Sequence, residues 1–412
     1  MPGHDGLHAV TRAPVPRPGS PDGLERDGQS ADRDQTAAGH LLLEWLMRAR
    51  ECAASDLHMT AGSPPCLRVS GVLTRLGEAP EITAALLADA TYALLQTAGY
   101  GQAWHDWYYE DHDLDLGLTV EGVGRLRVSL SFDRGGPSMD VRLVADRIPP
   151  LDALGLPAVT RSLMKRHAGL WIFTGATGSG KSTTQAAILR TMLDEHPHHV
   201  ITVEDPIEYM HGHGCGLVKQ REVGLDTVSF ERGLLGALRQ DPDVILIGEM
   251  RDLETIQQAV RAAETGHLVL TTLHTKDAPG AIDRLIDVFP PGQQDQIRLQ
   301  VSEVLLAVYA QQLVPAAPTV SDPDDRILRG RVAAVEVLLG PMAELYATAG
   351  QIREKRTHQL ATIMDSNGRL GCQTMERALV ELVLAGRITE QTAMDAAVRK
   401  ETFEGLLREL RR

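Results

Sequence analysis

The stretch Gly175-Ala176-Thr177-Gly178-Ser179-Gly180-Lys181-Ser182 has the spacing of a phosphate-binding loop, in which a glycine and four further residues precede Gly-Lys-Ser. An apolar run at residues 170–173 precedes it and is typical of a buried parallel strand, and residues 183–193 have the composition of a helix. Small residues let backbone N–H groups surround a phosphate, and the positive end of the helix dipole attracts it further. The sequence therefore predicts an α/β fold with a nucleotide-binding core.

The residue types of this loop have distinct expected roles in binding ATP. Lys181 is expected to reach the β- and γ-phosphates, and Ser182 to offer its hydroxyl to Mg²⁺. Glycine- and serine-rich turns are also common between strands and helices, but here both flanking elements are predicted. We therefore assign nucleotide binding to Gly175, Ala176, Thr177, Gly178, Ser179, Gly180, Lys181, Ser182 and Thr183.

Length and composition narrow the class of protein. A chain of 412 residues is too long to form one ordinary hydrophobic core, so we expect two or three domains. The net charge of -14 argues against a general affinity for nucleic acid, although it leaves room for a local basic stripe. No apolar run reaches the length of a transmembrane segment, and the N-terminus lacks the apolar core of a signal peptide. The four cysteines are scattered, which favours a reduced, cytoplasmic protein.

The pattern of residue types predicts four regions along the chain. Residues 1–39 are rich in Pro, Gly, Asp and Arg and are expected to form a disordered tail. Residues 40–148 are expected to form a small α+β domain, and residues 149–314 the ATPase core. Residues 315–412 are expected to supply the end of the core sheet and a C-terminal helical region. Pro149-Pro150 and Gly155-Leu156-Pro157 have the composition of an interdomain linker.

In the first domain, periodic apolar residues predict helices over residues 41–54 and 83–96. Alternating apolar residues at 114–120, 126–132 and 141–143 predict an antiparallel meander. The second and third of these strands and their turn carry Arg125, Arg127, Arg134 and Arg142. These arginines either are solvated or reach a nucleotide held by the other domain or by a neighbouring subunit, and the residues alone leave both readings open.

Acidic residues follow two predicted core strands. The apolar run 200–203 leads into Glu204-Asp205-Pro206-Ile207-Glu208, and three carboxylates beside a polyphosphate are useful if they serve a metal or activate water. An acidic turn that caps a helix is the alternative. The run 243–247 leads into Gly248-Glu249, with Gly248 where many NTPases carry the metal-binding Asp. We therefore expect Glu249 to bind Mg²⁺ through a water.

The remaining core segments predict a third strand at residues 267–273, which ends at His274-Thr275. A histidine there can donate to a γ-phosphate, although a lone histidine is more often structural. Residues 278–287 and 293–312 are expected to be helices, residues 331–339 the last strand, and residues 342–412 mostly helical. Two sets of metal-ligand residue types have no usual zinc spacing and are not assigned to a metal: His196, His198 and His199, and His211, His213 and Cys215.

Taken in order, residues 175–182, 204–208, 241–252 and 266–275 resemble the motifs of the secretion ATPase superfamily, which powers type II secretion and type IV pili. In that family they are the Walker A motif, the Asp box, the Walker B motif and the His box, the last with His267 and His274. The chain is most similar to the PilT type of pilus-retraction ATPase, because it has one compact N-terminal domain and no four-cysteine zinc site. Residues 341–353 do not reproduce a helical motif common in that type, which leaves an accessory paralogue or another secretion or conjugation motor open.

The resemblance implies a RecA-like core, a PAS-like N-terminal domain and a homohexameric ring that binds ATP and Mg²⁺. It implies an inner-membrane platform protein as partner, a peripheral location at the cytoplasmic face of that membrane, and no specific nucleic acid. It assigns water activation to Glu208, with Glu204 as the alternative, and adds His267 to the nucleotide-binding residues. Glu249, His274, Arg127 and Arg134 complete the implied catalytic set. A RecA-like nucleic-acid translocase and a nucleotide-binding regulator are the rival classes.

Overall fold

The computed structural model describes residues 31–69, 72–97, 112–144, 147–318 and 330–411. Residues 1–30 of the predicted tail lie outside the described residues. The chain divides into two compact units. One contains the described residues up to Arg147 together with Pro206–Tyr209 and Gly224–Asp226, and the other contains the rest.

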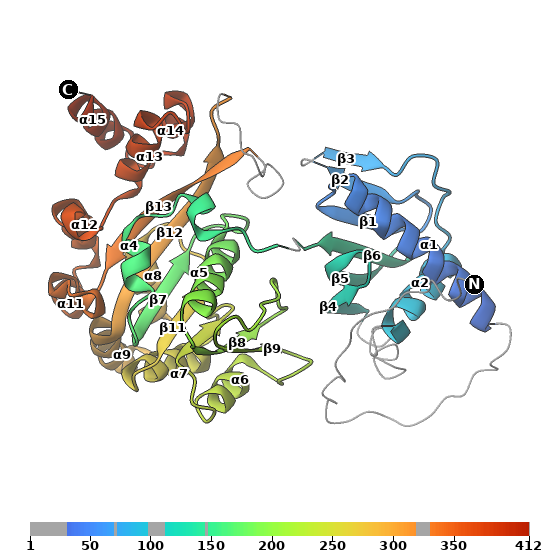
Figure 1. The fold of residues 1–412 in the computed structure, drawn as a ribbon, viewed down its shortest axis with the longest axis horizontal. Helices are drawn as coiled ribbons and strands as arrows, with labels where there is room; N and C mark the ends of the chain where they lie inside the picture. The colour runs from blue at the N-terminus through green and yellow to red at the C-terminus, as the bar shows by residue number, and fades with distance from the viewer. Residues whose placement is uncertain (1–30, 70–71, 98–111, 145–146, 319–329, 412) are drawn as a thin grey trace. The chain divides into compact units, whose positions relative to one another are not determined.

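The N-terminal unit is one antiparallel sheet with two long helices, as the alternating pattern predicts (Figure 1). Its strand order is β3-β2-β1-β6-β5-β4. Its elements are α1 (Ala31–Glu51), β1 (Asp56–Thr60), β2 (Cys66–Val69), β3 (Val72–Arg75), α2 (Ala84–Thr97), β4 (Asp113–Val120), β5 (Gly124–Asp133) and β6 (Gly136–Leu143). Because α1 begins at Ala31, residues 31–39 are helical rather than part of the disordered tail predicted for them.

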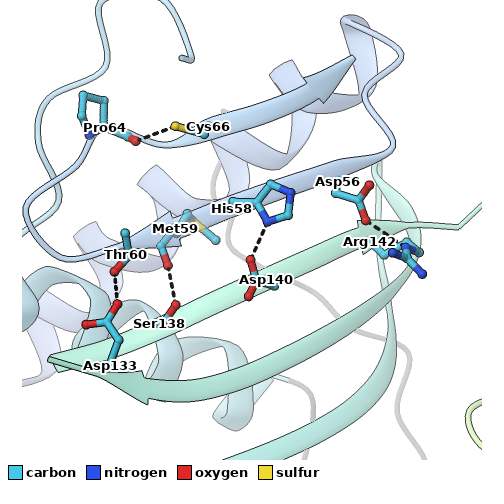
Figure 2. A network of polar contacts seen from close by, with 10 residues as sticks. All are labelled: Asp56, His58, Met59, Thr60, Pro64, Cys66, Asp133, Ser138, Asp140 and Arg142. Atoms are coloured by element: carbon cyan, nitrogen blue, oxygen red, sulfur yellow. Dashed lines mark hydrogen bonds and ion pairs between the residues drawn. The ribbon is translucent and has the colours of Figure 1, made fainter. Parts of the chain in front are cut away.

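The two faces of this sheet differ in polarity. Leu57 and Met59 of β1 are buried in the core with residues of α1 and α2. On the other face, polar side chains pair across β1, β6 and the end of β5 (Figure 2). Arg142 lies 2.8 Å from Asp56, and His58 lies 2.6 Å from Asp140. Arg142 is therefore tied to its own sheet, which favours the structural reading for this arginine.

The second unit contains a seven-stranded sheet of order β13-β12-β7-β11-β10-β8-β9 (Figure 1). Neighbouring strands are parallel, except that the edge strand β13 runs antiparallel to β12. The strands are β7 (Gly169–Thr174), β8 (His199–Glu204), β9 (Leu217–Glu222), β10 (Val244–Ile247), β11 (Leu268–Thr272), β12 (Leu305–Pro315) and β13 (Arg331–Leu339). The three predicted strands that precede acidic or histidine residues are thus present as β8, β10 and β11.

Helices lie in the connections between most of these parallel strands, as crossover connections require, whereas the chain passes from β8 to β9 without a helix. The core helices are α4 (Val159–Leu163), α5 (Lys181–Glu195), α6 (Phe230–Ala237), α7 (Leu253–Glu264), α8 (Ala278–Asp287) and α9 (Pro291–Val304). In the described residues, no helix has the length and apolar character needed to cross a membrane.

Two sequence predictions for this unit are wrong. The helix expected over residues 293–312 ends at Val304, and the chain continues directly as strand β12. Residues 305–310 are all buried, and such an apolar run suits a buried helix and a buried strand equally well. The predicted linker also ends earlier than expected, because Leu151 and Leu154 of η1 (Leu151–Leu154) are buried in the core.

The C-terminal region is helical, as predicted. It contains η2 (Pro341–Ala343), α11 (Tyr346–Arg353), η3 (Thr357–Gln359), α12 (Leu360–Ser366), η4 (Gly368–Leu370), α13 (Met375–Leu384), α14 (Glu390–Ala396) and α15 (Lys400–Leu410). Glu336 of β13 joins this region to the core, because its two carboxylate oxygens accept hydrogen bonds from the backbone N–H groups of Ala278 (2.8 Å) and Met375 (3.2 Å). These two residues begin α8 and α13, so one carboxylate caps both helices.

Burial raises the pKa of Glu336 to about 7, although the two N–H groups lower it. A glutamate whose pKa is higher in the folded protein than its usual 4.5 contributes stability that is fully present below pH 4.5. That contribution is lost as the pH rises through about 7.

We therefore predict that Glu336→Gln, which cannot titrate, changes how stability depends on pH. Between about pH 5 and about pH 8, the free energy of unfolding of the unmodified chain should fall relative to that of the variant. The fall should be about 1.4 kcal/mol for each unit by which folding raises the pKa of Glu336. Urea unfolding at both pH values measures the difference. Glu401→Gln, a change at an exposed glutamate of α15, is the matched control. Parallel pH profiles for the Glu336→Gln variant and the unmodified chain would contradict this account.

Candidate nucleotide-binding site

The carboxyl ends of four parallel strands meet at one edge of the core sheet. Ile172 of β7 pairs with Thr271 of β11, Thr271 with Ile247 of β10, and Ile247 with Val203 of β8. The segments that follow these strands therefore start side by side. They are the glycine-rich loop, the segment with His274, the segment with Glu249 and the acidic segment from Glu204. Ligands bind at this edge of open α/β sheets.

The glycine-rich loop has a backbone that few other residues adopt. Gly175, Gly178 and Gly180 have φ values of 143°, 79° and 90°. A Cβ atom on Gly175 would lie 2.3 Å from the carbonyl oxygen of Gln311, whereas a Cβ atom on Gly178 would meet nothing within 4 Å. The glycine at the start of the loop is thus required both by its φ and by its packing.

The side chains of the loop fit a polyphosphate. Lys181 is only 7% exposed, and its ammonium group donates to the carbonyl oxygens of Gly175 (2.8 Å) and Ala176 (3.1 Å). Helix α5 begins at Lys181, so its positive dipole end lies at the loop. Ser179 Oγ is buried and has no hydrogen-bond partner among the described residues. A cation, a helix N-terminus and an unused hydroxyl at one loop suit an anionic ligand.

The structure brings together two residues that the sequence only suggested. His274 Nε2 lies 3.4 Å from one carboxylate oxygen of Glu249, and Arg251 lies 2.5 Å from the other. The Glu249 side chain is 13% exposed, whereas His274 and Arg251 are largely exposed. The neighbouring Gly248 is confined, because a Cβ atom there would lie 3.3 Å from Glu204 Cα. This crowding disfavours a side chain at the position where many NTPases carry aspartate.

Glu204 is held at the same edge by its neighbours. Its carboxylate accepts hydrogen bonds from Thr202 Oγ1 (2.7 Å) and Gln220 Nε2 (3.4 Å). Thr275 is linked to the residue before the phosphate loop, because its backbone N–H donates to Thr174 Oγ1 at 2.8 Å. The segment with His274 is thereby fixed relative to the loop.

Other predicted residues lie elsewhere. His267 precedes β11 at the amino end of the sheet, where its Nδ1 contacts the carbonyl oxygen of Ala262 at 3.0 Å. Within one chain it therefore lies at the sheet edge opposite the phosphate loop, and nucleotide binding by His267 stays a prediction. Glu208, Arg127 and Arg134 belong to the N-terminal unit, so their approach to the nucleotide stays a prediction. Glu208 and Arg127 are half-buried, and Arg134 is exposed.

Some of the histidine and cysteine residues excluded from metal binding make ordinary structural contacts. His213 Nδ1 accepts from the backbone N–H of Val218 at 3.2 Å, and Cys215 Sγ donates to the carbonyl oxygen of Asp194 at 3.0 Å. His196 is the C-cap residue of α5. Burial, with the nearby charge of Arg190, lowers the pKa of His211 to about 4.

Sequence reasoning missed two residues beside the loop. Gln311 of β12 is 4% exposed, and its Oε1 accepts a hydrogen bond from Thr184 Oγ1 of α5 at 2.9 Å. Gln311 was expected in a helix, where it would have no relation to the loop. Its position beside Gly175 follows only from the pairing of β12 with β7.

Residues 110–405 match the family described as type II/IV secretion system protein. This chain belongs to that family. The type IV pilus retraction ATPase PilT of Pseudomonas aeruginosa is 38% identical over 362 residues, which cover 88% of this chain and 99% of PilT. The type IV pilus ATPase PilU of the same organism is 40% identical over 345 residues, which cover 84% of this chain and 85% of PilU.

The fold agrees with that of a solved family member. A crystal structure of the pilus retraction motor PilT with bound ADP superimposes with a TM-score of 0.76 and 38% identity, covering 88% of this chain and 99% of that one. The resemblance of the sequence to secretion ATPases is therefore confirmed, and so is its mixed α/β fold with two sheets.

The geometry of the phosphate loop in this chain yields a prediction. Gly178→Ala meets only backbone strain, about 1–2 kcal/mol for a left-handed residue. Gly175→Ala adds a clash with a backbone oxygen and should destabilise the protein at least twice as much. Urea unfolding without nucleotide measures both variants, and equal losses would show that the loop does not pack on β12 as described.

Proposed function

We propose that this chain is an ATP-hydrolysing motor that drives type IV pilus retraction and twitching motility. The observation that carries the proposal is the phosphate loop, with Lys181 inside it, at the sheet edge that also holds Glu249 and His274. The similarity to PilT along nearly the whole of that protein supports the choice of filament. In this reading the second unit is a RecA-like core, and the N-terminal unit is PAS-like. We propose residues 40–148, 149–314 and 315–412 as the functional divisions of the chain.

The loop residues would hold ATP, and Ser182 would hold Mg²⁺ with Glu249 as a ligand through water. When bound, Mg²⁺ neutralises phosphate charge and orients the γ-phosphate. Lys181 neutralises the charge of the β- and γ-phosphates, and the N–H groups at the start of α5 add to this effect. The present contacts of Lys181 with two carbonyl oxygens place its ammonium group within the loop itself.

We assign activation of the attacking water to Glu208, with Glu204 as the alternative. Glu204 already accepts hydrogen bonds from Thr202 and Gln220, which suits a residue that shapes the edge rather than one that takes up a proton. We assign to His274 a contact with the γ-phosphate. His274 is exposed at the sheet edge that carries the loop. Its Nε2 now faces a carboxylate oxygen of Glu249, and a γ-phosphate oxygen could take the place of that partner.

We further propose that the motor is a homohexamer whose sites are completed by Arg127 and Arg134. An arginine supplied by a second body raises phosphoryl-transfer rates by orders of magnitude and ties hydrolysis to movement. A ring of this kind would be peripheral at the cytoplasmic face of the inner membrane, bound to a platform protein there. The charge of -14 argues against nucleic acid as the load.

Three alternatives to the retraction motor are kept. The comparable similarity to the type IV pilus ATPase PilU favours a paralogous pilus ATPase, such as an accessory retraction motor, as the nearest alternative. A motor of another secretion or conjugation system is the next. A RecA-like nucleic-acid translocase is the alternative from another class. ATP hydrolysis that rises severalfold with added DNA would favour the translocase over the pilus motor.

Lys181→Ala should abolish ATP hydrolysis, because no other side chain of the loop carries a positive charge to the phosphates. Release of phosphate by the purified protein measures this. Lys165→Ala, at an exposed lysine, is the control and should hydrolyse ATP at the rate of the unmodified chain. Unchanged turnover in Lys181→Ala would overturn the ATPase assignment.

Glu208→Gln keeps shape and hydrogen bonding but removes the base. It should bind ATP normally and hydrolyse it at least about tenfold more slowly, since general bases contribute about 10²–10⁴-fold. Glu204→Gln is the matched comparison and should lose less. The reverse order of the two rates would move the base to Glu204.

Mixing two inactive variants tests whether a site is shared between chains. One chain carries Arg127→Ala and Arg134→Ala, and the other carries Lys181→Ala. Some interfaces of a mixed ring would combine an intact loop with intact arginines, so part of the hydrolysis should return. No return on mixing would show that the arginines act within their own chain or not at all.

A further inference from the structure

Strand β12 meets the phosphate loop at Gln311. The parallel pairing of β12 with β7 runs as far as Ala310 opposite Thr174, so Gln311 lies beside Gly175. Its carbonyl oxygen is the atom that a Cβ on Gly175 would strike at 2.3 Å. The first residue of the loop therefore packs directly on the backbone of this strand.

The Gln311 side chain extends to the end of the loop. Its Nε2 would lie 2.8 Å from a Cβ on Gly180, and its Oε1 accepts the hydrogen bond from Thr184 in the first turn of α5. Gln311 thus touches the start of the loop through its backbone carbonyl, and its buried side-chain amide touches the last glycine of the loop and the helix that follows. The other Walker A residues lie between these contacts.

The strand that carries Gln311 is anchored on its other side. Gln311 pairs with Val335 of β13, whose carbonyl oxygen accepts a hydrogen bond from Gln373 Nε2 at 2.6 Å. Two residue pairs before the loop, Phe173 and Tyr309 pack edge to face with ring centroids 5.6 Å apart. The amide of Gln311 is therefore held by rigid sheet structure and not by a loop.

We propose that Gln311 is a positioning residue for nucleotide binding, which acts through its hydrogen bond with Thr184 to hold the phosphate loop in its binding conformation. This inference rests on the proposed binding of ATP by that loop. Gln311 makes no contact of its own with nucleotide in this account. A preformed loop loses less conformational entropy on binding, so a loosened loop weakens affinity for any nucleotide with a β-phosphate.

Four variants separate the hydrogen bond from packing. Gln311→Met and Thr184→Val keep approximate shape, and each leaves a buried polar partner unpaired. Each should weaken binding of a fluorescent ADP analogue about fivefold or more, as expected for a buried group without its partner. Thr184→Ser keeps the hydroxyl and should bind within about twofold of the unmodified chain. The double variant Gln311→Met, Thr184→Val should bind no more weakly than the weaker single variant, because both changes remove one interaction.

Kinetics and a neighbouring residue provide the controls. The KM for ATP should rise with the ADP dissociation constant while kcat changes less, since the loop binds substrate and transition state alike. Gln312→Met, at the next residue of β12, changes a side chain on the opposite face of the strand and should leave ADP affinity unchanged.

The outcomes distinguish this inference from the proposed function. If the unmodified chain does not bind the ADP analogue, the function and the inference both fail. If it binds, Lys181→Ala does not, and Gln311→Met and Thr184→Val bind as tightly as the unmodified chain, only the inference fails. Equal weakening by Thr184→Ser and Thr184→Val would also overturn it, because packing and not the hydrogen bond would then position the loop.

Discussion

The packing of the phosphate loop on strand β12 is the constraint on which the rest of the nucleotide site depends. Gly175 approaches the Gln311 carbonyl oxygen so closely that no side chain fits between them. That approach requires β12 beside β7, and the contact of Tyr309 with Phe173 buries aromatic surface at the same junction. The C-terminal helices are joined to the other side of this strand pair through Glu336 and Gln373. The loop is therefore supported by segments that lie far from it in the sequence.

Charge balance is the second requirement of this sheet edge, because carboxylates beside a polyphosphate repel it unless cations intervene. Glu249 is paired with Arg251 and His274, and Glu204 is held by uncharged donors. The only lysine of the loop is almost fully buried within it. Glu249 and Glu204 at this edge can therefore bind a metal or activate a water, and neighbouring side chains restrain both carboxylates.

The sequence predicts most of this arrangement, but not how the elements pair in space. Local patterns gave the strands before Lys181, Glu204, Glu249 and His274, since spacing and apolar runs are properties of neighbouring residues. The helix predicted across residues 305–312 is a strand because burial on both faces removes the periodicity that separates the two. Gln311 was missed for that reason. His267 was grouped with His274 by motif, although one residue lies before the strand and the other after it.

The number of surface pili on cells that lack this gene tests the central claim most directly. A retraction motor removes assembled pili, so the deletion should leave more surface pili than the parent strain and abolish twitching. Restoring the gene should reverse both changes, and the Lys181→Ala form should not. Cells without any surface pili would show an assembly motor instead, and unchanged pili and twitching would contradict a motor role in retraction.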